Sequence, residues 1–374
     1  MVTVSLNILN PNFQRIAVVD HYTSLIWAKR YYEIGAIDLQ VEATTENLKI
    51  FKENNYITRE DDNSIYRIEA IELDTSVEQE NYLIIGAYDC KKILSQRITW
   101  NQINFDGTVE NYIRKIITDN IIDPDDDLRK INNFALKPAH GFTEEIQAQT
   151  QFDELDTKII ELCMANEYGW KVTFENGVLY FDLFKGVDHS TSQSENNHVV
   201  FSPAYDNLSS TKYNVDSSEY KNVALVGGEG EGTEKKTRAI GNASGLSRFE
   251  MYVSSNVSSN DDGDLVDYYE ALVADGKERL AEQATTVQFE GEIDPTFYKY
   301  KTDYDLGDII TIKNEYGIQI NARIVEVAET WDEEGYTIDL TFDNIDGEDE
   351  IIDGILTENE DLLMTENEEA IILE

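Results

Sequence analysis

Basic residues are scarce in this chain of 374 residues, with only 30 Lys and Arg against 74 Asp and Glu. The formal net charge is −44, and residues 348–374 contribute only a quarter of it. Nucleic-acid binding needs basic side chains that displace counterions from phosphates. The balance of charge therefore excludes specific nucleic-acid binding, and it also excludes adsorption to anionic membranes.

Cysteine and histidine are nearly absent, with two and four residues respectively. Cys90 and Cys163 show no metal-ligand spacing, and Cys163 falls on an apolar helical stripe, so we expect two buried thiols. The sequence contains neither H-E-x-x-H nor G-x-S-x-G. Acidic clusters at 123–127 and 261–264 lack the spacing of a calcium-binding helix–loop–helix, so we interpret them as solvated loops rather than ion sites. We expect no metal, no cofactor and no enzymatic activity.

Long apolar runs are missing as well, since no segment approaches the ~18 residues that span a bilayer. The first residues, MVTVSLNILNPN, lack the charged region of a signal peptide. This pattern predicts a soluble chain that is made in a cytoplasm and has no membrane span. Hydrophobic residues nevertheless make up 41% of the chain, including 21 Tyr and 14 Phe, so large cores can form.

Alternating apolar residues dominate both ends of the chain, as expected for strands that bury one face. The middle differs, because the apolar residues of 109–117 and of 155–163 recur at helical spacing. We expect Asp106 or Thr108 to cap the first helix and Gly169 to end the second. Asn176-Gly177 predicts the turn of a hairpin over 170–184.

These patterns predict an α+β, mainly β, multidomain chain with two related β-barrels. An α+β module and a helical insertion lie between the barrels. The predicted parts are a first barrel at 1–95, an α+β module at 96–200, a second barrel at 201–232 plus 287–347, an inserted segment at 233–286 with a helix at 264–284, and an acidic tail at 348–374.

The prediction of two related barrels depends on an internal similarity. Three blocks recur in the same order, and the gap between the last two is similar, at 15 and 13 residues, whereas the first gap differs, at 32 and 16. Strands of unrelated β domains can look alike, so duplication and coincidence both remain open. The paired blocks are Gly35–Leu39 with Gly307–Ile312, Arg67–Glu72 with Arg323–Ala328, and Tyr82–Ile85 with Tyr336–Leu340.

The stretch VGGEGEGTEKKTRAIG at 226–241 raises the question of a phosphate-binding loop. A Walker loop needs Lys and then Ser or Thr where Thr233 and Glu234 stand, and the glycine spacing also fails the dinucleotide fingerprint. Glu229 and Glu231 would point negative charge at a phosphate. We therefore predict a tight or flexible connection, in which a strand at 222–226 leaves the second barrel and the glycines turn the chain into the insertion.

A rare basic cluster follows these glycines on an otherwise acidic chain. We predict that Lys235, Lys236 and Arg238 contact a neighbouring acidic surface, with a neighbouring subunit as the first candidate. The alternative is that the three side chains are only solvated.

The order of several short motifs resembles a family. The chain is similar to the ReqiPepy-type tail-hub proteins of long-tailed phages of Gram-positive bacteria, to the N-terminal module of tail-associated lysins, and to the baseplate hub of contractile phages. The residues that carry the resemblance are Tyr22–Trp27, Arg30-Tyr31, Gly35, Ile93–Arg97, Tyr220–Gly232, Gly245–Glu250, Leu306–Asp308 and Ala322–Glu326.

The resemblance implies a structural protein of the virion, located at the phage tail tip or baseplate. It implies a homotrimeric ring with two barrels per chain, which closes or continues the tail tube through which DNA is ejected. The implied partners are the tail tube or distal tail protein, the tape measure protein, and receptor-binding or fibre proteins. A lumen lined with carboxylates would let DNA pass without sticking.

Two alternatives remain beside the hub interpretation. Tyr-rich β surfaces also permit a receptor-binding or cell-wall-carbohydrate-binding tail protein. A wall hydrolase is not expected, because lysin-bearing relatives continue into a hydrolase domain whereas this sequence ends in the octapeptide repeat LTENEDLL–MTENEEAI. That acidic repeat predicts either a frayed tail or a plug formed with two symmetry copies.

Overall fold

The computed structural model describes residues 4–344 except 76–80, 260–266, 284, 285, 295, 315, 317 and 318. The chain divides into two compact units. Unit 1 comprises Met1–Lys185, Val215–Thr286 and Ala328–Tyr336, and unit 2 comprises Gly186–Asn214, Val287–Val327 and Thr337–Glu374. The five predicted domain boundaries stay a prediction.

The first β-barrel belongs to unit 1 and has seven strands in the order β2-β1-β5-β6-β7-β4-β3. Alternation places one face of each strand inside, where Trp27, Leu39 and Tyr66 are fully buried. The expected strands are confirmed, and one short helix, α1 (Asn47–Ile50), joins them. The strands are β1 (Leu6–Leu9), β2 (Arg15–Val19), β3 (Ser24–Arg30), β4 (Ala36–Glu42), β5 (Tyr56–Arg59), β6 (Asp62–Asp74) and β7 (Tyr82–Asp89).

The α+β module, also in unit 1, contains both predicted helices. The Thr108 side chain caps α2 (Val109–Ile117) by accepting a hydrogen bond from the Asn111 N–H, and the apolar stripe of α2 is buried against α3 (Leu155–Ala165). Both cysteines are buried free thiols. The strands of the module are β8 (Ile103–Thr108), which pairs with β10 (Glu145–Thr150), and β9 (Phe134–Leu136), β11 (Gly169–Glu175) and β12 (Val178–Phe184).

The hairpin between β11 and β12 is confirmed, with Asn176 and Gly177 at positive φ of 52° and 83°. The prediction that Gly169 ends the second helix is wrong. Helix α3 is followed by Asn166 at its C-cap, and Glu167 is the residue with positive φ, at 56°. Gly169 instead begins β11, where a Cβ would lie 2.2 Å from the Tyr31 ring, so this glycine permits a close approach.

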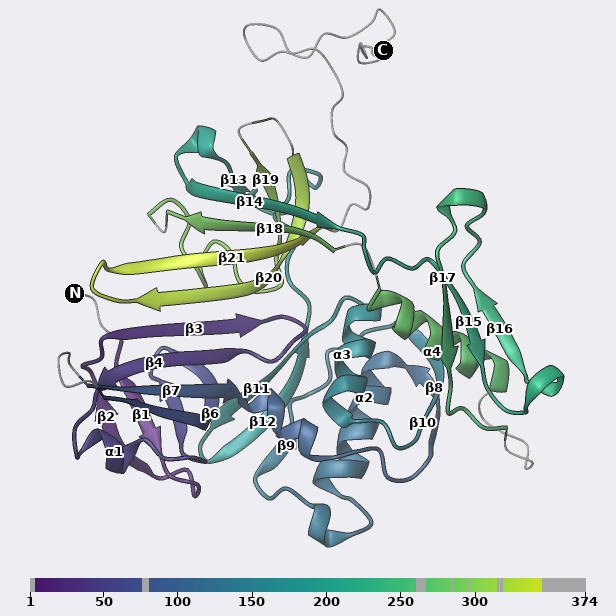
Figure 1. The fold of residues 1–374 in the computed structure, drawn as a ribbon, viewed down its shortest axis with the longest axis horizontal. Coiled ribbons are helices and arrows are strands. Elements are labelled where there is room, and N and C mark those ends of the chain that lie inside the picture. The colour runs from purple at the N-terminus through teal and green to yellow at the C-terminus, as the bar shows by residue number, and fades with distance from the viewer. Residues whose placement is uncertain are drawn as a thin grey trace, which may run out of the picture. The chain divides into compact units, whose positions relative to one another are not determined.

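A separate three-stranded sheet completes unit 1. Strand β15 (Val223–Gly227) lies between antiparallel β16 (Thr237–Ile240) and parallel β17 (Glu250–Ser254). Helix α4 (Tyr268–Ala281) lies between this sheet and α3 (Figure 1). The expected helix of the insertion is confirmed over these residues. The prediction that the strand at 222–226 leaves the second barrel is wrong, because β15 lies between β16 and β17 in this separate sheet.

The second β-barrel belongs mainly to unit 2 and has the order β14-β18-β21-β20-β19-β13. The predicted strands over 285–345 are confirmed. Phe201, Tyr304 and Phe342 pack in its core. The strands are β13 (Val200–Phe201), β14 (Leu208–Asp216), β18 (Thr286–Ile293), β19 (Ile309–Lys313), β20 (Gln319–Trp331) and β21 (Tyr336–Asn344).

Five strands of each barrel share one topology. In chain order β3, β4, β5, β6 and β7 correspond to β14, β18, β19, β20 and β21, and the neighbours are the same, β3-β4-β7-β6-β5 and β14-β18-β21-β20-β19. The block pairs that begin at Arg67 and Tyr82 are therefore aligned correctly. The pair of Gly35 with Gly307 is wrong, because Gly35 precedes β4 and Gly307 precedes β19, the counterpart of β5.

Candidate functional site on the three-stranded sheet

The three-stranded sheet has one buried and one exposed face. On the inner face Ala224, Val226 and Val253 pack against Ala271 and Leu272 of α4, and all five are at least 95% buried. This apolar contact holds the sheet to the helix.

The outer face of this sheet carries an apolar row. Leu225 lies directly opposite Ala239 on one side and Tyr252 on the other, so the three side chains cross the sheet in a line. Leu225 is 44% exposed and Tyr252 is 54% exposed. We call Leu225, Ala239 and Tyr252 the outer row. A contiguous exposed apolar row of this kind is typical of a protein contact surface.

The glycine stretch forms the turn between β15 and β16. The Gly228 N–H donates to the Lys236 carbonyl at 2.9 Å, and Gly230 and Gly232 adopt positive φ of 93° and 55°. A Cβ on Gly228 would lie 2.0 Å from the hydroxyl of Tyr268 on α4. The predicted tight connection is confirmed. Its glycines allow positive φ at Gly230 and Gly232 and the close approach of Tyr268 at Gly228.

Glu229 anchors this turn to a distant segment. Its carboxylate accepts hydrogen bonds from the Ser259 N–H at 2.6 Å and the Ser259 hydroxyl at 2.5 Å, and it pairs with Lys236 Nζ at 2.9 Å. The hydrogen bonds from Ser259 and the Lys236 ammonium lower the pKa of Glu229 to about 2. Glu229 thus acts as an internal anion that holds its own loop.

The predicted basic cluster is not gathered into one patch. Lys236 lies on Glu229 and over the Tyr268 ring at 4.7 Å, and the Arg238 guanidinium stacks on Tyr269 at 3.5 Å. No ion pair forms at Lys235 within the described part of the chain. Two of the three cations are therefore committed to contacts inside the subunit, and a contact with another subunit stays a prediction.

Other candidates from the sequence are dispersed. Within residues 4–344 and outside the gaps given above, no three His, Cys, Asp or Glu residues are arranged to hold a metal ion. The acidic cluster at 261–264 lies outside the described residues, as does the octapeptide repeat. His140 contacts Asp182 at 2.9 Å.

Over the same described range, no helix combines the length and apolarity needed to traverse a bilayer.

A buried ionic network between α3 and α4 was not predicted. Lys158 Nζ lies 2.5 Å from Glu278 Oε2, Arg279 pairs with Glu161, and Lys158, Glu161 and Glu278 are each at most 4% exposed. Burial alone would lower the pKa of Lys158, but the Glu278 carboxylate raises it above its ordinary value. Burial raises the pKa of Glu161 to about 8. In a chain with 74 acidic residues no sequence pattern distinguishes these from solvated charges.

The fold is that of phage tail proteins. The tail protein from Neisseria meningitidis MC58 is similar over 92% of this chain and 97% of its own, with TM-score 0.57 and 11% identity. The 43 kDa tail protein of prophage MuSo2 from Shewanella oneidensis matches 91% of this chain and 98% of its own, with TM-score 0.53 and 10% identity. The prophage tail protein gp18 from Listeria monocytogenes EGD-e matches 91% and 94%, with TM-score 0.50 and 14% identity.

The sequence itself identifies the family. Residues 5–343 match the family described as Siphovirus ReqiPepy6 Gp37-like protein. The chain belongs to this family, as the motifs quoted above predicted. A comparison with curated proteins gave no match. The family and the fold together define a structural protein of a phage tail.

Proposed function

We propose that this protein is the hub of the phage tail tip or baseplate, where three copies form a ring that closes or continues the tail tube. The observation that carries the proposal is the repeated barrel. Each chain holds two barrels in which five strands share one topology, so three chains would supply six similar barrels. Closed rings of identical chains are the usual form of such assemblies, and six barrels would continue a six-fold tube.

The partners follow from this position. The ring would contact the tail tube or distal tail protein above, the tape measure protein inside, and receptor-binding or fibre proteins around it. The role is architectural rather than enzymatic. We assign the outer row, together with Lys235, to the contact between subunits. An apolar row beside a cation that makes no ion pair with the described residues suits an acidic neighbour.

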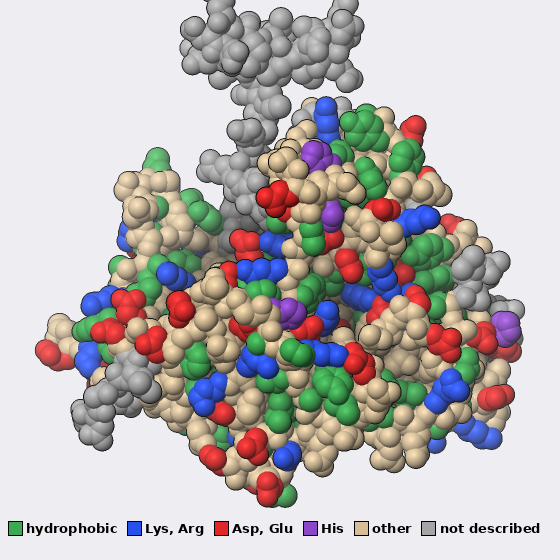
Figure 2. Space-filling model, turned by 180° about the vertical axis from the view of Figure 1, so that it is seen from behind, with side chains coloured by type: hydrophobic (Ala, Val, Ile, Leu, Met, Phe, Trp, Pro, Cys, Tyr) green, Lys and Arg blue, Asp and Glu red, His purple; other side chains and the backbone are tan. Residues whose placement is uncertain are grey.

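The net charge of −44 fits a ring through which DNA passes. Carboxylates lining a lumen repel phosphates, so DNA slides without binding. Figure 2 shows acidic and basic side chains interspersed over the surface in view.

The mass of the purified protein tests the ring. Native mass spectrometry and electron microscopy are expected to show a trimer and closed rings. A monomer that binds purified cell-wall glycans would contradict the proposal and favour the carbohydrate-binding alternative. Release of fragments from purified peptidoglycan would show a hydrolase instead.

Variants of the outer row test the contact surface. Leu225→Glu is expected to raise the dissociation constant of the trimer at least tenfold, because it places a charge in an apolar contact. Leu128→Glu is the matched control, since Leu128 is 91% exposed and lies in the α+β module, on the short 3-10 helix Asp127–Arg129. An unchanged trimer in Leu225→Glu would remove the outer row from the interface.

The basic cluster is tested in the same assay. Reversing all three charges at Lys235, Lys236 and Arg238 should weaken the ring. Lys235→Glu is the sharper variant, because Lys236→Glu would also break the internal pair with Glu229. If Lys235→Glu assembles like the wild type, this side chain is only solvated.

A further inference from the structure

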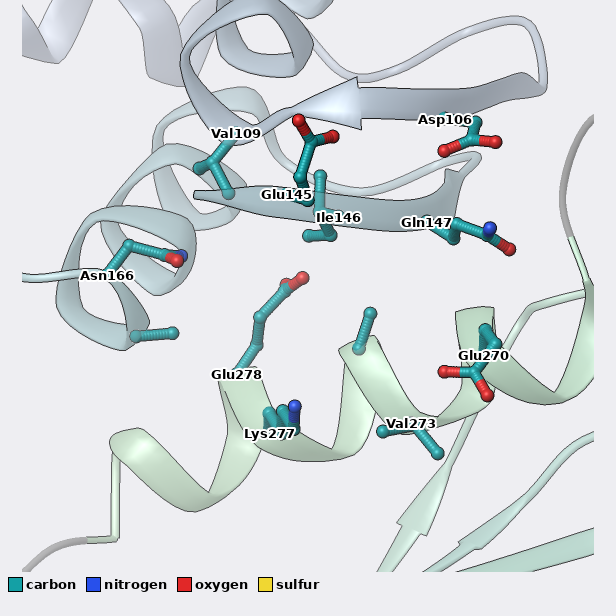
Figure 3. Close-up of a pocket in the computed structure, with 12 residues that line it drawn as sticks. Asp106, Val109, Glu145, Ile146, Gln147, Asn166, Glu270, Val273, Lys277 and Glu278 are labelled. Carbon is teal, nitrogen blue, oxygen red and sulfur yellow. The ribbon is translucent and has the colours of Figure 1, made fainter. Parts of the chain in front are cut away.

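A cavity of about 500 Å³ lies within unit 1, between β10 and α4. The end of α3 closes one side through Ala165 and Asn166. Figure 3 shows the Glu278 side chain rising from α4 towards β10 across this space. Neither the glycine turn nor the outer row contributes a residue to the cavity.

The lining of the cavity combines negative charge with apolar walls. Asp106, Glu145 and Glu270 are exposed at its rim, and Glu278 lies inside at 2% exposure. The walls are aliphatic, and the single basic residue that lines the cavity is Lys277. The aliphatic residues are Val109, Ile146, Ala165, Val273 and Ala274. Such a lining suits a ligand that carries positive charge on an aliphatic stem.

Glu278 supplies an independent reason to expect a ligand. One of its oxygens, Oε2, pairs with Lys158 Nζ at 2.5 Å. The other, Oε1, is buried and has no hydrogen-bond donor among the described residues. A buried carboxylate oxygen without a donor is costly, so an N–H group in the cavity would be stabilised there.

The spacing of the acidic groups favours an extended cation over a metal ion. No three acidic groups among the described residues are close enough to share a metal ion. A ligand with an N–H donor at Glu278 and a stem along the aliphatic walls would instead match the cavity from its interior to the acidic rim.

We propose that this cavity binds an alkylammonium or guanidinium group on an aliphatic stem. Glu278 receives the cationic head, and Asp106, Glu145 and Glu270 attract it at the rim. The group comes either from a free polyamine or from a Lys or Arg side chain of a neighbouring tail protein. The site goes beyond the proposed hub role and stands whether or not the chain forms a ring.

Calorimetric titration of the full chain tests the site, with two probes at about 0.15 M salt to screen non-specific attraction. The probes are 1,5-diaminopentane for a free polyamine and N-acetyl-arginine amide for a protein side chain. At least one probe is expected to bind with one-to-one stoichiometry. Binding of 1,5-diaminopentane alone indicates a polyamine site, and binding of N-acetyl-arginine amide alone indicates a site for a partner's side chain.

Variants place the binding in the cavity. Glu278→Gln keeps the shape but removes the charge, and it should weaken binding about tenfold to a hundredfold. Because this change also leaves Lys158 without its partner, Ala274→Leu provides a second test that fills the cavity and spares the ion pair. Glu60→Gln removes one exposed charge elsewhere in unit 1 and should leave binding unchanged.

Two results would overturn the proposal. One is the absence of heat with both probes at millimolar concentration. The other is equal binding by the wild type and Ala274→Leu, which would show that the cations adsorb to the acidic surface rather than enter the cavity.

Discussion

The two barrels can be compared residue by residue where strand pairing makes one segment of each equivalent. In the first barrel Asn54–Arg59 reads NNYITR, and in the second Gly307–Ile312 reads GDIITI. Tyr56 pairs with Arg67 and Ile309 pairs with Arg323, which fixes this alignment.

The backbone confirms the equivalence of the two segments. The Asn54 N–H donates to the Ile68 carbonyl, and the Ile68 N–H donates to the Asn55 carbonyl. In the second barrel the Gly307 N–H donates to Ile324, and the Ile324 N–H donates to Asp308. Both Asn54 and Gly307 have positive φ, at 67° and 95°.

One position in these equivalent segments carries a side chain of opposite character in the two barrels. Arg59 follows Thr58 as the buried Ile312 follows Thr311, although the register of β5 against β6 shifts at this step, and Arg59 is itself only 5% exposed. Its guanidinium lies 5.1 Å from the Trp27 ring and 4.8 Å from the Trp331 ring, and it pairs with Glu329 at 2.8 Å. The same strand arrangement therefore holds an apolar residue in one barrel and a paired cation in the other. Each residue type needs different neighbouring side chains.

Exchanging this position should produce the largest effect. Arg59→Ile gives the first barrel the residue of the second and leaves Glu329, which is 4% exposed, as an unpaired buried charge. We expect a loss of about 3–5 kcal/mol in the free energy of unfolding. Denaturant unfolding followed by tryptophan fluorescence measures it, because Trp27 and Trp331 flank the site.

A double variant separates charge from packing. Arg59→Ile combined with Glu329→Gln should recover much of the loss, because the Gln still accepts a hydrogen bond from Tyr336. Asp61→Asn is the matched control at the exposed partner of Arg59 and should cost far less. Wild-type stability of Arg59→Ile alone would show that the buried pair contributes nothing.

Substitution of Gly307, which has positive φ, should produce the next largest loss of stability. Gly307→Val should cost at least about 1–2 kcal/mol of stability, because a β-branched residue resists positive φ. Gly307→Asn should cost clearly less, since Asn54 occupies the equivalent place in the first barrel. Thermal unfolding of the two variants tests the alignment of the barrels, and equal losses would argue against it.

The smallest expected effect is on local stability, from loss of the Glu229 interactions in the insertion. The insertion occupies the connection from β14 to β18, which in the first barrel is the short connection from β3 to β4. Glu229 has a lowered pKa in the folded state, so its contribution is present above its ordinary pKa of 4.5 and is lost as the pH falls towards about 2.

Hydrogen exchange measures this contribution locally. In the wild type the amides of β15–β17 should lose protection as the pH falls through that window. Glu229→Gln should lower their protection already at neutral pH and leave β19–β21 unaffected. Equal protection of β15–β17 in both proteins would mean that Glu229 does not hold the turn.

Periodicity was sufficient to predict that both ends of the chain form strands, and it predicted the helices α2 and α3 and the hairpin turn at Asn176-Gly177, but not the strands β8, β9, β10, β16 and β17. It could not align the barrels fully, because Gly35 and Gly307 both precede short apolar strands although Gly35 avoids a clash and Gly307 provides positive φ. The pairing of β15 was missed because alternation shows that a strand has two faces but not which strand lies beside it. The burial of the Glu278 carboxylate could not be predicted from the sequence, because it depends on how α3 and α4 pack together.

The Arg59–Glu329 pair joins residues 270 positions apart. During synthesis the strands of the first barrel emerge early and can pair at once, since domains generally fold from the N-terminal end. Asp61 is available to Arg59 at once, but Glu329, its buried counter-ion, leaves the ribosome only near the end of synthesis. The first barrel therefore completes its buried ion pair only after most of the chain has been made.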